Sequence, residues 1–316
     1  MKLVRFHRCG DARGRDGWLL LLGWVAIFLF PLVRELKAER PVTFAHYNLE
    51  NYLVMDRKEH GQIVHEAKPD AEVGPLIRII QQIHPDLLGV AEMGPPDQFR
   101  SFRERLAAAG VSFADEEYVQ GADPDRHLAF LSRFPIVARH SQGNVPIDMP
   151  MPERPEAMRR GLLDVTVEVN PSTRIRLVGA HLKSKLPIPE GEALVRRAEA
   201  QKLREHVEAI LHEAPDTLLL VYGDLNDTKD APAIAEVAGP RDDPAALSDL
   251  WLADADGDRW TYYRRYTDTY ARIDYIFVNR KLFPKVDRTR SYLFRSPEWN
   301  RASDHRPLIA CLQLDQ

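Results

Sequence analysis

Residues 218–228 read LLLVYGDLNDT, an apolar run that ends in a glycine and a cluster of polar side chains. Because nearly every position from 218 to 222 is apolar, the run predicts a central strand that is covered on both faces. Asp224, Asn226 and Asp227 come directly after it, where side chains project from the rigid edge of a sheet. Asp and Asn also favour turns, so this cluster taken alone is equally typical of a structural turn.

The same arrangement, a polar cluster at the end of an apolar strand, recurs along the chain. Asp274 stands out because apolar residues flank it, and a carboxylate there is costly to bury unless it is paired. Each cluster alone has an ordinary structural explanation, such as a loop, a satisfied strand histidine or a surface carboxylate. Their joint occurrence favours one shared site. The other clusters are Asn48-Leu49-Glu50-Asn51, Glu92, His181-Leu182-Lys183-Ser184, Arg272-Ile273-Asp274-Tyr275 and Ser303-Asp304-His305-Arg306.

The clusters combine carboxylates, carboxamides and two histidines, and they contain no thiol. Oxygen-rich sets of this kind suit Mg²⁺ or Mn²⁺ rather than zinc. Such an ion neutralises phosphate oxygens while a base or an ordered amide directs a water molecule. The residues therefore indicate hydrolysis of a phosphoester, with Mg²⁺ or Mn²⁺ as the cofactor.

Strands alternate with a few long helices in the rest of the chain. Apolar residues at helical spacing predict helices at 72–84, 98–109 and 192–212, the last with Leu194 among its inward-facing residues. The polar residues 51–70 predict a surface loop. These elements indicate an α+β fold of two packed sheets flanked by helices. Strands are expected at 42–48, 87–91, 128–132, 136–139, 162–169, 175–182, 218–222, 273–278, 291–294 and 308–314.

The composition is that of an ordinary globular protein, with 44% hydrophobic and 28% charged residues among 316 and a net charge of −4. Two cysteines far apart in the sequence exclude a disulfide scaffold and a cysteine-rich zinc site. The chain has no polybasic tract of the kind that binds nucleic acid by charge alone.

The first 40 residues predict a targeting segment. Residues 1–17 are rich in Lys and Arg, and residues 18–33 read WLLLLGWVAIFLFPLV, without a charge. A basic flank before an apolar run is typical of exported chains. We therefore expect residues 1–40 to be a signal peptide or a single membrane anchor formed by a hydrophobic helix, although a buried core helix is the alternative. Residues 41–316 are then one domain outside the cytoplasm, periplasmic, extracellular or anchored to the membrane through residues 18–33. No protein partner is indicated.

Seven segments between residues 45 and 310 carry a specific resemblance. They are AHYNLENYL, PDLLGVAEM, LAFLSRFPI, GAHLKSK, VYGDLNDT, RIDYIFVN and SDHRPLIA. Together they resemble the endonuclease/exonuclease/phosphatase superfamily, the fold of pancreatic deoxyribonuclease, apurinic/apyrimidinic endonucleases and neutral sphingomyelinases. GDLND, SDHRP and the strand glutamate are highly specific in combination. The resemblance implies a four-layer α/β/β/α sandwich and metal-dependent hydrolysis of phosphoester bonds.

The resemblance also implies a role for each matching residue. Glu92 looks like the metal-binding glutamate, Asn48 beside it looks like a ligand of the metal or the phosphate, and Asp304 resembles a further metal-site carboxylate. Asp224 is similar to the residue that positions or deprotonates the attacking water, and Asn226 to its neighbour that orients the phosphate. The remaining matches are His305 to a phosphate-facing histidine, Asp274 to its carboxylate partner, His181 to a second histidine that the apurinic branch lacks, and Arg160, more weakly, to a phosphate-contacting arginine.

Physical chemistry agrees with these roles. A carboxylate that accepts a hydrogen bond from a histidine raises the pKa of that histidine. An Asp274–His305 pair could therefore stay cationic at neutral pH, grip a phosphate and donate a proton to the leaving oxygen. A metal ion at Glu92 would polarise the phosphoryl group from another side, and hydrolysis would need an in-line water beside Asp224.

The sequence leaves three hypotheses for the function. Residues 41–316 carry 35 Lys and Arg against 43 Asp and Glu, and this net charge of −8 weighs against tight non-specific binding of nucleic acid. Local positive charge at Arg159-Arg160 and Arg264-Arg265, with aromatic residues between 260 and 270, could still hold bases or flank a lipid headgroup, or form a packing surface. We expect a phosphodiesterase acting on nucleic acid. A lipid or small phosphate ester is the alternative substrate, and a non-catalytic module of the same fold is the third hypothesis.

Overall fold

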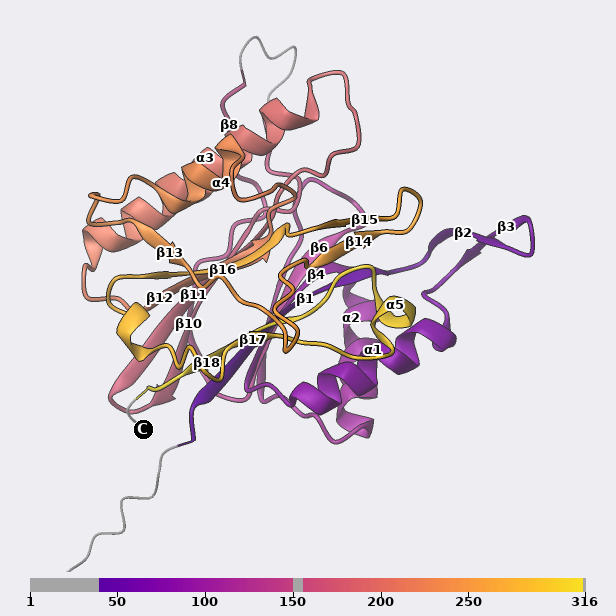
Figure 1. The fold of residues 1–316 in the computed structure, drawn as a ribbon, viewed down its shortest axis with the longest axis horizontal. Coiled ribbons are helices and arrows are strands. Elements are labelled where there is room, and N and C mark those ends of the chain that lie inside the picture. Colours follow the sequence, from indigo (N-terminus) through magenta and orange to yellow (C-terminus); the bar gives the residue numbers. More distant parts are fainter. Residues whose placement is uncertain (1–39, 150–155, 315–316) are drawn as a thin grey trace, which may run out of the picture. The chain divides into compact units, whose positions relative to one another are not determined.

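Two six-stranded mixed β-sheets form the centre of the computed structural model, which describes residues 40–149 and 156–314 (Figure 1). The first sheet contains β1 (Val42–Tyr52), β4 (Leu87–Met93), β5 (Asp115–Val119), β6 (His127–Ser132), β17 (Tyr292–Leu293) and β18 (Leu308–Leu312), in the order β17-β18-β1-β4-β6-β5. The second contains β7 (Ile136–Arg139), β10 (Leu162–Asn170), β11 (Thr173–His181), β12 (Leu219–Asp224), β13 (Leu247–Asp249) and β16 (Asp274–Asn279), in the order β13-β16-β12-β11-β10-β7.

Helices cover the outer face of each sheet and complete four layers (Figure 1). One apolar core fills the space between the sheets, and two more lie beneath the helices. The expected α+β sandwich of four layers is thereby confirmed. The helices are α1 (Asp70–Ile83) and α2 (Pro96–Ala108) on the first sheet, and α3 (Glu192–Glu213) and α4 (Pro232–Ala238) on the second.

The predicted targeting helix lies outside the described residues, which begin at residue 40. Within the part of the chain that the structure describes, none of the helices combines the length and the apolar character that a bilayer span requires. The assignment of residues 1–40 to a signal peptide or an anchor therefore stays a prediction.

The central strands carry their polar clusters to one edge of the sandwich. β1 and β4 are parallel neighbours, so Asn48 and Glu92 lie toward the same end of the first sheet. In the second sheet β11 and β12 are also parallel, and His181 lies opposite Asp224. β16 runs antiparallel to β12 and begins at this edge, with Asp274 opposite Asp224.

The prediction of a surface loop over residues 51–70 is wrong. β2 (Met55–Glu59) pairs with β3 (Gln62–Glu66) as an antiparallel hairpin. His60 and Gly61 connect the strands with φ values of 47° and 86°, the left-handed pair that a two-residue type I′ turn requires. The hairpin forms a separate two-stranded sheet and is largely exposed, so it lacks the apolar alternation that identifies a half-buried strand.

One residue of α3 faces a different side than predicted. Leu194, expected to point inward, leaves 52% of its surface exposed. The buried face instead contains Val195 and Glu199, which lie four residues apart on one side of the helix. The Glu199 carboxylate accepts the backbone N–H groups of Arg159 and Lys183, so a charged residue takes a core position and ties the helix to two loops.

The remaining elements span two to four residues each, too short to show a periodicity. They are β8 (Pro146–Ile147), β9 (Glu156–Ala157), β14 (Tyr262–Arg264), β15 (Thr269–Ala271), the 3₁₀ helix η1 (Phe283–Lys285) and α5 (Trp299–Ala302). The sequence pattern also missed β5 and α4. Among the short elements, the hairpin β14–β15 matters most, because it leads directly into β16 and Asp274.

Gly89 of β4 makes room for Tyr222 of β12 between the two sheets, since a Cβ added at residue 89 would overlap the tyrosine ring. We expect Gly89→Ala to lower the free energy of unfolding by about 1–3 kcal/mol, the usual cost of overpacking, in urea denaturation. Gly74→Ala is the matched control, because a Cβ in this turn of α1 meets only the flexible Arg78 guanidinium, at 3.3 Å. It should be neutral or stabilising by about 0.5–1 kcal/mol. Equal losses in both variants would contradict the packing assignment.

Candidate active site

An irregularity in the pairing of β1 with β4 shapes one half of the site. The register of the two strands shifts after Asn48, and the backbone of Glu50, Asn51 and Glu92 takes left-handed φ values of 49°, 57° and 60°. Such bulges re-aim side chains beside functional sites. Here the bulge lets the Glu92 carboxylate accept the backbone N–H of Asn51 at 2.8 Å, which holds Glu92 Oε1 toward the space between the sheets.

The amide of Asn48 joins the two sheets at this edge. Its Nδ2 donates to Glu92 Oε1 at 3.2 Å and to Asp224 Oδ2 at 3.0 Å, while its Oδ1 accepts the backbone N–H of Glu50. Asp224 Oδ1 in turn accepts the backbone N–H of Asn226 at 2.9 Å. Two carboxylates from different sheets are therefore bridged by one carboxamide.

His305 and Asp274 form a buried pair on the other side of Asp224. His305 Nδ1 lies 2.8 Å from Asp274 Oδ2, and His305 Nε2 lies 3.7 Å from Asp224 Oδ2. Ser303 fixes the histidine backbone, because its hydroxyl accepts the N–H of His305 and donates to the carbonyl of Asn48. The ring therefore turns one nitrogen to Asp274 and the other to Asp224.

His181 completes the group from β11. Its Nε2 lies 3.6 Å from Asp224 Oδ2 and 4.0 Å from Glu92 Oε1. Burial, together with the positive charge of Arg160, lowers the pKa of His181 well below its ordinary value, so this ring is neutral at pH 7. His305 behaves oppositely: burial opposes its charge, but Asp274 outweighs burial and raises the pKa of His305 well above its ordinary value.

The carboxylates of the site divide into two classes. Burial, reinforced by repulsion from Asp274, raises the pKa of Asp224 to about 8. Burial also raises the pKa of Asp304 to about 7. Burial disfavours ionisation of Asp274 as well, but the charge and hydrogen bond of His305 hold the pKa of Asp274 below its ordinary value. A site that separates the pKa values of neighbouring carboxyl groups in this way is equipped for proton transfer.

The donor set fits a divalent cation. Two groups of three side chains bring one potential ligand atom each within 4.8 Å of one another, and Asp224 belongs to both. They are Glu92 with His181 and Asp224, and Asp224 with Asp274 and His305. The mutual repulsion of buried carboxylates is what a bound cation relieves, and carboxylate oxygens are the ligands that hard cations prefer.

Three predicted residues lie at the margin of this arrangement. Asn226 donates its side-chain amide to the carbonyl of Leu182 and holds Asp224 through its backbone. Asp304 lies 3.8 Å from His305 Nε2 and belongs to neither ligand group. Arg160 pairs with Asp123 at 3.0 Å, with only 8% of its side chain exposed, and its Nε and Nη1 have no hydrogen-bond partner among the described residues.

Sequence reasoning missed several residues that support the site. The Thr261 hydroxyl accepts the backbone N–H of Asp274, and Arg126 donates to the side chain of Asn51. His46 lies beneath the site, two residues before Asn48 on the same face of β1. Its partner on the opposite sheet, like the other two contacts, arises only from tertiary packing, so no sequence pattern marks it.

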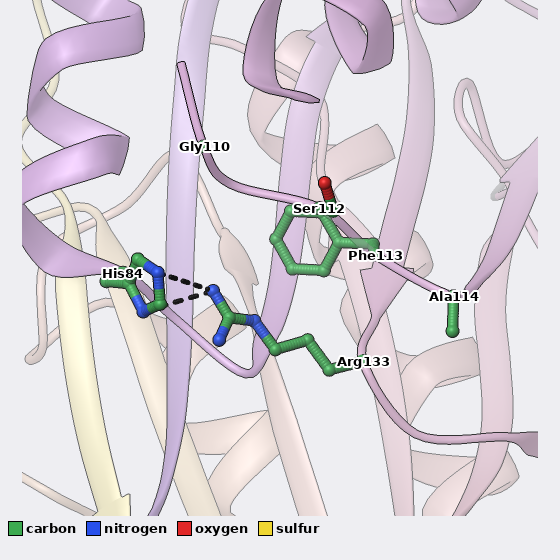
Figure 2. A pocket seen from close by; sticks show the side chains of 6 residues that line it. All are labelled: His84, Gly110, Ser112, Phe113, Ala114 and Arg133. Carbon is green, nitrogen blue, oxygen red and sulfur yellow. Dashed lines mark hydrogen bonds between the residues drawn. The ribbon is translucent and has the colours of Figure 1, made fainter. Parts of the chain in front are cut away.

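A surface hollow of about 440 Å³ lies elsewhere, and Figure 2 shows Arg133 reaching across it to the ring of His84, 3.0 Å away. Residues 110 and 112–114 line the rest of it. His84 precedes β4, whereas Glu92 lies near the far end of that strand. At about 3.3 Å per residue the hollow is therefore roughly 20 Å or more from the carboxylate cluster.

Metal-free protein should lose stability as pH rises, because the pKa of Asp224 is higher in the folded than in the unfolded chain. The folded state then binds the extra proton, so the free energy of unfolding falls between about pH 4 and about pH 8. We expect urea denaturation in EDTA to show this fall, and Asp224→Asn or saturating Mg²⁺ to reduce it. Asp230→Asn, at an exposed site, is the control. An unchanged slope in Asp224→Asn would contradict the assignment.

Comparison with known proteins agrees with the fold. The model of the Endonuclease/Exonuclease/phosphatase family matches residues 47–305. No curated protein sequence matches the chain. Among solved structures, the human Nocturnin catalytic domain with bound sulfate superposes with a TM-score of 0.60 at 17% identity, covering 86% of this chain and 93% of that chain.

Two further solved structures superpose over a similar length. Truncated TDP2 from Caenorhabditis elegans gives a TM-score of 0.54 at 16% identity, covering 86% of this chain and 97% of that chain. Sphingomyelinase C from Streptomyces griseocarneus gives a TM-score of 0.57 at 14% identity, covering 87% of this chain and 100% of that chain. At these identities the likeness shows the fold alone, whereas the family model matches most of the chain. The protein therefore belongs to the endonuclease/exonuclease/phosphatase family, whose members hydrolyse phosphoester bonds.

Proposed function

We propose that this protein is a divalent-metal-dependent phosphodiesterase that cleaves nucleic acid. The observation that carries the proposal is the shared position of Asp224, which lies within 4 Å of both His305 and His181 and is bridged through Asn48 to Glu92. The site therefore gathers three groups around one point: the neutral His181, the cationic His305 and the carboxyl group of Asp224, whose pKa is raised. These are the groups that phosphoester hydrolysis needs.

The chain's own residues divide the work between two sides of the scissile bond. His305, kept protonated by Asp274, presents Nε2 as a donor that neutralises a phosphate oxygen or protonates the leaving oxygen. Asp224, when ionised, orients the attacking water and accepts its proton. His181 is neutral and contributes hydrogen bonding without adding charge.

Glu92, Asp224 and His181 would hold the divalent cation, which leaves the protonated His305 and its partner Asp274 free for the substrate. When bound, Mg²⁺ or Mn²⁺ supplies Lewis-acid polarisation of a phosphoryl oxygen. Asn48 fixes the two carboxylates relative to each other, since its amide donates to both of them.

Arg160 supports an anionic substrate beside the cation. Its guanidinium is buried and keeps two nitrogens without a hydrogen-bond partner among the described residues. A buried donor left unsatisfied costs free energy, which an oxygen of a bound phosphate would recover. The charge of Arg160 also contributes to the lowered pKa of His181.

The hairpin β14–β15 favours nucleic acid among the phosphodiesters. The Tyr262 ring lies 4.9 Å from the His305 ring, and Tyr266 at the hairpin end is 95% exposed. Exposed Arg264 and Arg265 lie between them in the sequence. Aromatic rings beside guanidinium groups hold the bases and phosphates of a single strand, and local charge allows this despite the net negative charge of residues 41–316.

A lipid phosphodiester is the second candidate substrate. Tyr266 and Ile63, at the ends of hairpins β14–β15 and β2–β3, are 95% and 75% exposed, and both hairpins extend to the same side in Figure 1. Exposed apolar and aromatic side chains of this kind also suit contact with a lipid surface.

We further propose that the enzyme acts outside the cytoplasm. The support is the sequence of residues 1–40, whose basic flank and apolar run are typical of export. A phosphatase reporter that is active only outside the cytoplasm, fused after residue 40, tests this proposal. An inactive reporter in the fusion would refute it.

A substrate panel tests the proposed function on the full-length chain. With Mg²⁺ or Mn²⁺ we expect nicking of supercoiled plasmid, cleavage of a single-stranded oligonucleotide and hydrolysis of bis(p-nitrophenyl) phosphate, and EDTA should abolish all three. Release of phosphocholine from sphingomyelin vesicles without cleavage of nucleic acid would instead support the lipid substrate. No hydrolysis of any of them would refute the catalytic proposal.

His305→Ala should lower kcat on the best substrate by about 10²–10⁴-fold, the usual contribution of a general acid or base. His206→Ala is the matched control, since His206 also contacts a buried carboxylate, Asp164 at 2.7 Å, but belongs to α3 outside the site. It should keep the wild-type kcat. A folded His305→Ala variant with near-wild-type turnover would refute the assigned role.

A further inference from the structure

His46 occupies the floor of the site, one layer below Asn48. It lies on β1 and is 1% exposed. Alternate residues of a strand share a face, so His46 points into the space between the sheets together with Phe44 and Asn48. There its ring lies 5.4 Å from that of Tyr222, on the opposite sheet. His46 thus lies between the polar residue Asn48 at the edge of the sheets and the apolar core that begins at Phe44.

Both ring nitrogens of His46 face oxygen acceptors. Nδ1 lies 3.3 Å from the carbonyl oxygen of Gly89, on the neighbouring strand β4. Nε2 lies 3.3 Å from Oδ1 of Asp274, on the other sheet. Neither Nε2 nor Asp274 Oδ1 has a hydrogen-bond partner among the described residues, so the 3.3 Å approach between them is an ion-pair contact. The contact therefore joins two buried polar atoms that have only each other.

Asp274 is consequently held between two histidines. Its Oδ2 is 2.8 Å from His305 Nδ1, and its Oδ1 faces His46. The terminal torsion of an aspartate has a broad, shallow profile, so its partners set the orientation of the carboxylate. His305 alone engages one oxygen and leaves rotation about that contact open, whereas a donor on each oxygen defines the plane.

The orientation matters because Asp224 lies directly opposite Asp274 on β12. A carboxylate that rotated away from His305 would turn its negative charge toward Asp224, and like charges opposite each other in a sheet are destabilising. His46 faces Oδ1, the carboxylate oxygen that His305 does not contact. The contact therefore keeps the charge of Asp274 directed at the histidine.

We propose that His46 is a positioning residue for the reaction: by engaging Asp274 Oδ1 it fixes the carboxylate that orients His305. The inference rests on the proposed function, since it concerns the same site. His46 acts through Asp274 and touches no substrate.

Two polar substitutions separate positioning from packing. Glutamine carries its amide nitrogen where histidine has Nε2, so His46→Gln keeps a donor toward Asp274. Asparagine carries its nitrogen nearer the Nδ1 position, so His46→Asn places its donor toward Gly89 and leaves Asp274 Oδ1 without one. We expect kcat to fall about 10- to 100-fold in His46→Asn and His46→Ala, the range typical of an outer-shell partner, with KM unchanged. His46→Gln should retain most of the wild-type kcat.

A spectroscopic measurement makes the test independent of turnover. The proton that His305 Nδ1 shares with Asp274 should give a downfield NMR resonance in the wild type. We expect it to shift or broaden in His46→Asn and to persist in His46→Gln and in the control His206→Ala. Urea denaturation of each variant monitors the fold.

The outcomes distinguish the two proposals. If the wild type hydrolyses no phosphodiester, the proposed function fails, and the resonance of His305 still decides the role of His46. If the wild type is active but His46→Asn matches it in kcat and in the resonance, His46 has no positioning role. Equal losses of kcat in His46→Gln and His46→Asn, in proportion to their losses of stability, would show a packing role and overturn the inference.

Discussion

Two carboxylates face each other across adjacent antiparallel strands. The rest of the site compensates the free energy that the repulsion between these two buried groups costs. Asp224 and Asp274 occupy opposed positions of β12 and β16, buried from water. Such a pair cannot carry two negative charges without compensation. Side chains of β1 and of the loop before β18 supply it: Asn48 faces the first carboxylate, and His305 and His46 face the second. The pKa values of the two groups separate as a result.

The sandwich makes this arrangement possible because the groups of the site come from both sheets of a rigid framework. Asn48 and Glu92 belong to one sheet, while His181, Asp224 and Asp274 belong to the other. The apolar core between the sheets brings the two edges together, so the free energy of packing holds polar groups in positions that they would not adopt alone. Burial of the site and perturbation of its pKa values are therefore two results of one packing interface.

The layered fold could be predicted because it depends on local pattern: buried strands are apolar throughout, and helices repeat their apolar residues every three to four positions. The polar clusters could be located for the same reason, as breaks in that pattern at Asp224 or Asp274. His46 could not, because a histidine within a strand is typical of many structures, and only the opposite sheet gives it a partner.

Other features escaped prediction because their cause is tertiary or local geometry. The hairpin β2–β3 has no buried face and so no apolar alternation. Leu194 lies one position away from the buried stripe of α3, and Glu199 enters that stripe because two backbone N–H groups satisfy it. Hydrogen bonds that compensate a buried charge cannot be inferred from residue type alone.

The two hairpins beside the site have a consequence for how this protein can diversify. Each forms a two-stranded sheet of its own, although Tyr262 of β14 also forms an isolated bridge with His305. β2–β3 follows Asn48 along the chain, and β14–β15 precedes Asp274. Changes in the length or composition of β2–β3, or of the end of β14–β15 near Tyr266, break no ladder of the main sheets and leave the bridge from Tyr262 to His305 intact. Natural variation can therefore remodel what the enzyme recognises while its reactive groups stay in place, so selectivity and turnover can evolve as separable traits.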